Sequence, residues 1–144
     1  MSSLFIDTNI PMYAAGTPHP LREHAQRVIR WVVEGRVDGV TDAEVFQEIL
    51  YRYFAIGERT KGLQIFDSFY RIMAGRILPV SGEDVRQARD LADHYPRLSP
   101  RDLVHLSVML GSQLEEIVSA DQDFDDVQEV KRIALEAFPL DPGV

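Results

Sequence analysis

The stretch Leu4-Phe5-Ile6-Asp7-Thr8-Asn9 sets the expected fold, because a short apolar run ends at once in polar, turn-forming residues. Such a run is typical of a buried strand that stops where the polar residues begin. A second strand-like run, Glu116-Ile117-Val118-Ser119, leads in the same way to Asp121. The two runs predict two strands, each followed at its carboxyl end by an aspartate.

Helical and strand-like patterns alternate over the rest of the chain. Apolar residues recur at helical spacing over residues 21–34, 45–54 and 66–73, and two further helices are expected after the N-cap residues Ser81 and Ser99. Ser81 and Asp84 fit a capping pair, and Pro100 suits the first position of a helix. Additional strands are expected at 37–40, 77–80 and 130–135, and Pro79 places the middle one near an edge or strand end. Strands separated by helices predict a three-layer α/β/α sandwich with a short, mostly parallel sheet.

The length and composition fit one globular domain, expected to span residues 1–144. There is no cysteine, which excludes disulfides and thiolate metal sites. The N-terminal residues lack the basic and apolar regions of a signal peptide, and no apolar run approaches the length of a bilayer span. We therefore expect a cytoplasmic protein with no membrane association.

The net charge of −8 is distributed unevenly along the chain. Residues 1–82 hold equal numbers of bases and acids, so the whole excess of acids lies in residues 83–144. A protein that binds nucleic acid by charge alone normally carries a basic surface. Any contact with a polyanion is therefore expected on the first half, where the candidates are Arg22, Arg52, Arg59 and Lys61.

Four acids are expected at one end of the predicted sheet. Asp7 and Asp121 follow strands, Asp102 lies in the first turn of the helix after Ser99, and Glu48 lies on the helix that follows the second strand. Ligands of open α/β sheets bind outside the carboxyl ends of the strands. Clustered carboxylates repel one another unless a cation is present, and oxygen ligands suit Mg²⁺ or Mn²⁺. Such ions activate water and stabilise a leaving oxygen, so the pattern favours phosphodiester hydrolysis.

Each acid also has a simpler interpretation. Asp7 fits a polar turn, Glu48 an exposed helical ion pair, Asp102 a capping box, and Asp121 an acidic loop. Taken singly, these interpretations suffice. The joint placement of four acids beside strand ends is what favours a site.

Two further residues of the same helices have competing interpretations. Glu44 is an alternative to Glu48 as the site acid of its helix, but it lies three residues after Thr41, and the two fit a capping box. We therefore assign Glu44 to the cap and Glu48 to the site. His105, one helical turn after Asp102, has metal-ligand spacing, but its apolar neighbours favour a satisfied, half-buried histidine. Trp31 is expected in the core.

The chain resembles the PIN domain, and in particular the VapC-type toxins of bacterial and archaeal toxin–antitoxin pairs. The resemblance rests on four blocks in a fixed order, which together reach from the first strand to about Phe124: residues 4–9, 43–50, 101–105 and 117–124. It implies a small α/β/α sandwich and a Mg²⁺- or Mn²⁺-dependent endoribonuclease whose products carry 5′-phosphate and 3′-hydroxyl ends. It also implies a homodimer that is silenced by a small antitoxin whose tail enters the site.

The resemblance assigns roles to seven residues. The acidic quartet would be Asp7, Glu48, Asp102 and Asp121, with Asp123 as an outer metal ligand. Ser119 would help to hold Asp7 or a water, and Asn9 would support Asp7. The alternative is a catalytically inactive PIN-like module that binds nucleic acid or protein, although a pure binder has no use for a self-repelling cluster. An aspartyl phosphatase would need an acid at position 9, and residues 57–62 do not form a P-loop.

Overall fold

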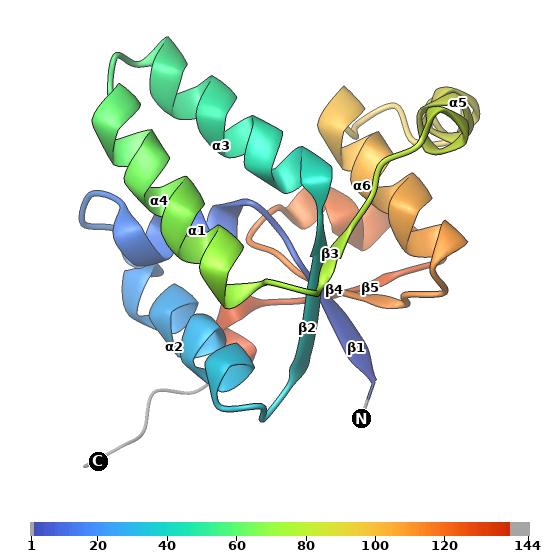
Figure 1. Cartoon of the computed structure of the whole chain (residues 1–144). Helices are drawn as coiled ribbons and strands as arrows, with labels where there is room; N and C mark the ends of the chain where they lie inside the picture. Colours follow the sequence, from blue (N-terminus) through green and yellow to red (C-terminus); the bar gives the residue numbers. More distant parts are fainter. Residues whose placement is uncertain (1, 139–144) are drawn as a thin grey trace.

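The computed structural model describes residues 2–138, which fold into one parallel sheet between two layers of helices (Figure 1). The strands are β1 (Ser3–Ile6), β2 (Asp38–Asp42), β3 (Ile77–Leu78), β4 (Glu116–Val118) and β5 (Lys131–Ile133). The α-helices are α1 (Asn9–Ala15), α2 (Arg22–Val33), α3 (Ala43–Ala55), α4 (Arg59–Ile72), α5 (Gly82–Leu91) and α6 (Pro100–Gly111). Two short 3₁₀ helices follow, η1 (Gln122–Asp126) and η2 (Leu135–Ala137).

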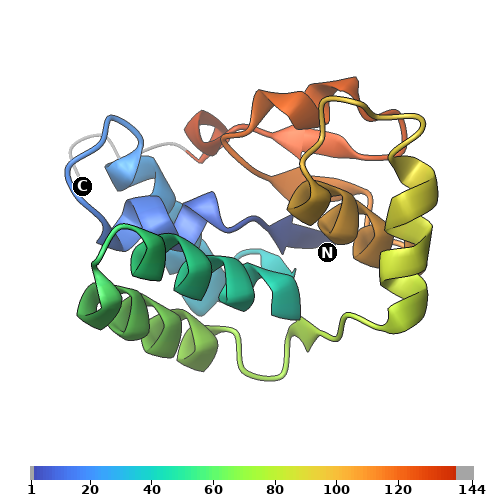
Figure 2. The same cartoon turned by 90° about the horizontal axis from the view of Figure 1, so that it is seen from above.

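The order of the strands explains the two layers. Within the described residues the sheet has the order β3-β2-β1-β4-β5, and every neighbouring pair is parallel. Crossovers between parallel strands are right-handed, so the step from β1 through β2 to β3 places α1–α4 on one face. The return from β3 to β4 places α5 and α6 on the other face, as both views show (Figures 1 and 2). The predicted α/β/α sandwich is confirmed, and the sheet is wholly parallel.

The central strand is buried on both faces. Leu4, Phe5 and Ile6 of β1 are all buried, and so are Ile117 and Val118 of the neighbouring β4. A parallel sheet that is covered on both sides by helices requires apolar side chains pointing both ways. The continuous apolar run that was interpreted as a buried strand therefore lies at the centre of the sheet.

Several local predictions are confirmed. Ser81 and Asp84 form a reciprocal capping box at the start of α5. Ser99 caps α6 by accepting a hydrogen bond from the backbone N–H of Asp102, with Pro100 in the first turn. β3 lies at an edge of the sheet, as Pro79 indicated. Trp31 packs against the core, although it is only partly buried.

Two helix boundaries differ from the prediction. The helix expected over residues 66–73 begins earlier, because Arg59, Thr60 and Lys61 form the first turn of α4. Gly62 weakens the helical pattern there, yet it is required by packing: a Cβ at this position would lie 2.5 Å from the Cβ of Tyr53 on α3. α1 was not predicted, because it is short and contains Pro11.

The predicted cap of α3 is also wrong. The N-cap residue is Asp42, whose Oδ1 accepts a hydrogen bond from the backbone N–H of Val45. The Thr41 hydroxyl donates instead to the carbonyl oxygen of Ile6 on the neighbouring strand. Thr41 and Glu44 therefore do not form a capping box.

None of the helices among residues 2–138 is long and apolar enough to cross a membrane. The predicted domain extends to residue 144, and its residues 1 and 139–144 lie outside the described residues.

Candidate functional site

The predicted acids meet at the point where the strand order changes direction. From β1 the chain moves first to β2 and β3, while β4 lies on the other side of β1. The connections that leave the carboxyl ends of β1 and β4 therefore run in opposite directions, and this is where open α/β sheets bind ligands. The structure has a cleft of about 440 Å³ at this place. All five predicted acids line it: Asp7, Glu48, Asp102, Asp121 and Asp123.

Asp7 is buried and is held through both of its carboxylate oxygens. The backbone N–H of Thr8 donates to Oδ1 at 2.7 Å. The Ser119 hydroxyl donates to Oδ2 at 2.6 Å, and the Asn9 amide donates to the same oxygen at 3.3 Å. Burial nevertheless raises the pKa of Asp7, because these hydrogen bonds and the nearby His105 only partly offset the loss of water.

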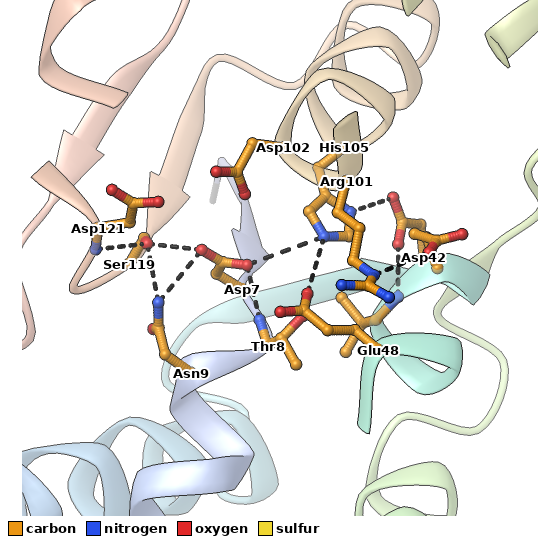
Figure 3. A network of polar contacts seen from close by, with 12 residues as sticks. Asp7, Thr8, Asn9, Asp42, Glu48, Arg101, Asp102, His105, Ser119 and Asp121 are labelled. Carbon is orange, nitrogen blue, oxygen red and sulfur yellow. Dashed lines mark hydrogen bonds and ion pairs between the residues drawn. The ribbon is translucent and has the colours of Figure 1, made fainter. Parts of the chain in front are cut away.

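Ser119 connects the ends of β1 and β4. Its Oγ accepts hydrogen bonds from the backbone N–H of Asp121 at 2.9 Å and from the Asn9 amide at 3.2 Å, while it donates to Asp7. Asn9 also accepts from the backbone N–H of Ala120 at 3.2 Å. Ser119 and Asn9 therefore orient Asp7 (Figure 3). Asp121 in turn caps η1 by accepting from the backbone N–H of Asp123.

Glu48 reaches the cleft from α3 and is only 7% exposed. Its Oε1 accepts from the Thr8 hydroxyl at 2.8 Å, and its Oε2 accepts from the Arg52 guanidinium at 2.8 Å. Burial alone would raise the pKa of Glu48, but His105, Thr8 and Arg52 outweigh it and lower the pKa to about 2. Glu48 thus makes the helical ion pair of the simpler interpretation and also lines the cleft.

Glu44 lies apart from these acids. It forms an ion pair with Arg101 of α6, with 3.5 Å between Nε and Oε1. The structure therefore brings Glu48, and not Glu44, beside Asp7.

His105 is completely buried, not half-buried as expected, and it lies between carboxylates on two sides (Figure 3). Its Nδ1 is 2.8 Å from Oδ2 of Asp42, while its Nε2 is 3.9 Å from Asp7 and 3.8 Å from Glu48. Burial would lower the pKa of His105, but Asp42 and Glu48 outweigh it and raise that pKa well above its ordinary value. His105 is therefore a buried cation that partly neutralises the acids.

The environment of Asp102 also disfavours a negative charge. Burial, the charge of Asp7 and the neighbouring Asp121 together raise the pKa of its carboxyl to about 7. The carboxylate of Asp102 makes no return hydrogen bond to Ser99 in the described structure, so the capping box is only half formed. A second cation beside Asp102 would relieve this repulsion.

The residues present fit a hard divalent cation. Ligand atoms of Asp7, Asp102 and His105 all lie within 4.8 Å of one another. His105 is poorly suited as the third ligand, because Nδ1 is engaged by Asp42 and Nε2 faces two carboxylates that favour a bound proton. The anionic donors that line the cleft are carboxylate oxygens, which suit Mg²⁺ or Mn²⁺.

Comparison with known proteins identifies the family. The family model of the PIN domain matches residues 4–130. Ribonuclease VapC13 of Mycobacterium tuberculosis is 39% identical over 131 residues, which are 91% of this chain and 99% of that protein. The chain belongs to the PIN-domain family and is a VapC relative. Ribonuclease VapC23 of the same species is 39% identical over 104 residues, which are 72% of this chain and 81% of that protein.

Solved VapC structures share the fold of this PIN domain. VapC20 of Mycobacterium tuberculosis, described as a toxin that cleaves the sarcin–ricin loop, superposes with a TM-score of 0.70 at 17% identity. The match covers 88% of this chain and 96% of that one. DNA-bound VapBC from Salmonella typhimurium superposes with a TM-score of 0.70 at 14% identity, covering 94% and 99% of the two chains. At these identities the likeness concerns the fold.

Sequence reasoning missed three residues around the cleft of this PIN domain. Asp42 was hidden within the predicted cap of α3, and only the fold brings it to His105 on α6. Arg101 lines the cleft and stacks over the ring of Tyr51, 4.3 Å from its centroid. Because Arg101 is next to Asp102 in the sequence, its place at the cleft could have been predicted. No sequence pattern predicts its contact with Tyr51 on α3.

Proposed function

We infer that this PIN-domain protein is an endoribonuclease that hydrolyses RNA phosphodiester bonds as the toxin of a toxin–antitoxin pair. The observation that carries this inference is the cleft where five acids from α3, α6, η1 and the segments that follow β1 and β4 converge. The close relatives named as VapC ribonucleases support the same activity.

We further propose that the enzyme depends on Mg²⁺ or Mn²⁺. Asp7, Asp102 and Asp121 would hold the ion, and Glu48 and Asp123 would complete its surroundings through water. When bound, the ion supplies an activated water and neutralises charge on the leaving 3′ oxygen. The raised pKa of Asp102 supports this assignment, because a cation removes the reason for that shift.

The chain's own groups position this chemistry. Thr8, Asn9 and Ser119 fix both oxygens of Asp7, so that its remaining lone pairs face the cleft. Arg52 and Arg101 line the cleft and can contact the phosphates that flank the scissile one. By the resemblance to PIN-domain ribonucleases, we expect cleavage to leave 5′-phosphate and 3′-hydroxyl ends.

The proposed partners follow from the family. The solved VapBC-5 of Mycobacterium tuberculosis, which shares the fold, is described as a member of the VapBC family of toxin–antitoxin systems. We propose that a small antitoxin silences this chain by entering the cleft. A homodimer and a cytoplasmic location remain predictions. Co-purification with the product of an adjacent small reading frame would test the antitoxin proposal. Sedimentation of the purified protein and of the pair would test the homodimer.

The activity is tested with purified protein and RNA. Cleavage is expected with Mg²⁺ or Mn²⁺, and EDTA should stop it. Asp7→Asn and Asp121→Asn should remain folded, as judged by circular dichroism, and lose activity by at least about a hundredfold. Undiminished cleavage by either variant would refute the assignment. Absence of cleavage by the wild-type protein would leave the inactive binding module as the function.

A matched pair of variants tests the choice of helix acid. Glu48→Gln should lose activity, whereas Glu44→Gln should retain most of it, because Glu44 faces Arg101 and not Asp7. The opposite result would exchange their roles.

A further inference from the structure

A second cavity of about 440 Å³ adjoins the acidic cleft. It lies between the end of α3, the start of α4, α1 and the first turn of α6. Met12, Arg52 and Arg101 line both spaces, so the two cavities share a wall. A flexible chain that occupies the cleft can continue directly into this neighbouring cavity, which we call the side pocket.

The side pocket exposes an aromatic ring and an aliphatic side chain. Tyr51 and Ile56 line it and are 56% and 68% exposed, although both belong to apolar or amphipathic types that are usually covered. The Arg101 guanidinium lies over the ring of Tyr51 but leaves more than half of the residue accessible. The exposed ring surface, backed by a planar cation, is a stacking platform of the kind that single-stranded RNA bases use.

The charges of the side pocket favour a polyanion. Among the described residues that line it, the cations are Arg52, Lys61 and Arg101, and the acid is Glu58. Arg52 and Arg101 are partly engaged by Glu48 and Glu44, but each keeps exposed surface. The excess of cations beside a strongly acidic cleft means that a bound strand would meet opposite charge immediately outside the catalytic acids.

We propose that the side pocket binds the nucleobase of a nucleotide next to the scissile phosphate of single-stranded RNA, with Tyr51 as the stacking surface. This rests on the proposed function, because it assumes that the acidic cleft holds a phosphodiester. An unstacked base would pack against the aromatic and apolar surface, while the flanking phosphates would form ion pairs with Arg52, Lys61 and Arg101. Tyr51 is then a residue that binds substrate and not one that participates in the chemistry.

Binding of RNA to an inactive protein tests this proposal without requiring cleavage. In an Asp7→Asn background with EDTA, fluorescence anisotropy would compare an oligouridylate with an abasic oligomer of the same length and charge. Tyr51→Ala should weaken the affinity for the oligouridylate by between about 5-fold and about 150-fold, the loss expected for one base–aromatic stack. It should leave the affinity for the abasic oligomer unchanged. Tyr51→Phe keeps the ring and should bind both oligomers as the parent does.

Tyr70→Ala is the matched control, because Tyr70 is 52% exposed and lies on α4 outside the side pocket. It should not change either affinity. Equal weakening of both oligomers by Tyr51→Ala would overturn the proposal, since the effect would then come from displaced cations. An unchanged affinity for the oligouridylate would overturn it in favour of a polypeptide occupant. If the wild-type protein does not cleave RNA but the base-dependent loss is observed, the proposed function fails and the nucleobase site stands.

Discussion

Asp102 should destabilise the metal-free protein at neutral and alkaline pH, and Asp102→Asn should remove this cost. The pKa of the Asp102 carboxyl is raised from 3.8 to about 7. At a pH between these two values, the Asp102 carboxyl is protonated in the folded protein and ionised in the unfolded chain. Stability therefore falls as the pH rises through this window, and the full cost is present above about pH 7.

The expected magnitude follows from the shift. One pKa unit corresponds to about 1.36 kcal/mol, so a shift of about three units sets an upper limit near 4 kcal/mol. Because Asp102 keeps some contact with solvent and is coupled to Asp7 and Asp121, we expect about 1–3 kcal/mol. In EDTA at pH 8, Asp102→Asn should be more stable than the wild type by this amount, while at pH 4 the two should be nearly equal.

Urea denaturation followed by circular dichroism would measure both proteins across this pH range, with EDTA and with Mn²⁺. Mn²⁺ should stabilise the wild type at pH 8 and should stabilise Asp102→Asn far less, because binding to the folded state depends on the carboxylate. Asp67→Asn, which removes an exposed acid of α4, is the control and should change stability little. A difference between Asp102→Asn and the wild type that does not vary with pH would refute the reasoning.

Three further variants test the buried charge, the orientation of Asp7 and the packing of α4 on α3. His105→Gln should cost about 3–5 kcal/mol in urea denaturation, because it removes a buried cation from its carboxylate partners; a loss below 1 kcal/mol would contradict its role as a cation. Ser119→Ala should lower kcat/KM by roughly tenfold while the protein stays folded, because one of the groups that orient Asp7 is lost; Ser112→Ala, at the end of α6, is the control. Gly62→Ala should cost about 1–3 kcal/mol by forcing α4 away from Tyr53, and Gly82→Ala, where a Cβ meets nothing within 4 Å, should cost less.

The fold was predictable because its strongest signals are local. The apolar run of β1, the caps at Ser81 and Ser99, and the acids that follow β1 and β4 depend on neighbours in the sequence. The positions of Asp7 and Asp121 could be inferred for the same reason, since parallel strands bring their carboxyl ends to one edge.

The parts that the sequence did not reveal depend on contacts between distant segments. Asp42 and His105 are 63 residues apart, and no local pattern connects them. The start of α4 was missed because Gly62 is unfavourable for a helix on its own, and only the proximity of Tyr53 explains it. Arg101 and Tyr51 likewise meet only because α3 and α6 approach each other at the cleft.

The two oxygens of Asp42 have different partners, and this determines how the two helical layers can separate. Oδ1 holds the first turn of α3, while Oδ2 holds His105 in the middle of α6. α3 and α6 cover opposite faces of the sheet (Figure 1). If either helix detaches, the contact between Asp42 and His105 breaks and leaves a buried charge without its partner. The two helices should therefore open as one cooperative unit. Amide protons of α3 and α6 should therefore exchange with solvent together, and the cleft between them should retain its shape until the whole domain unfolds.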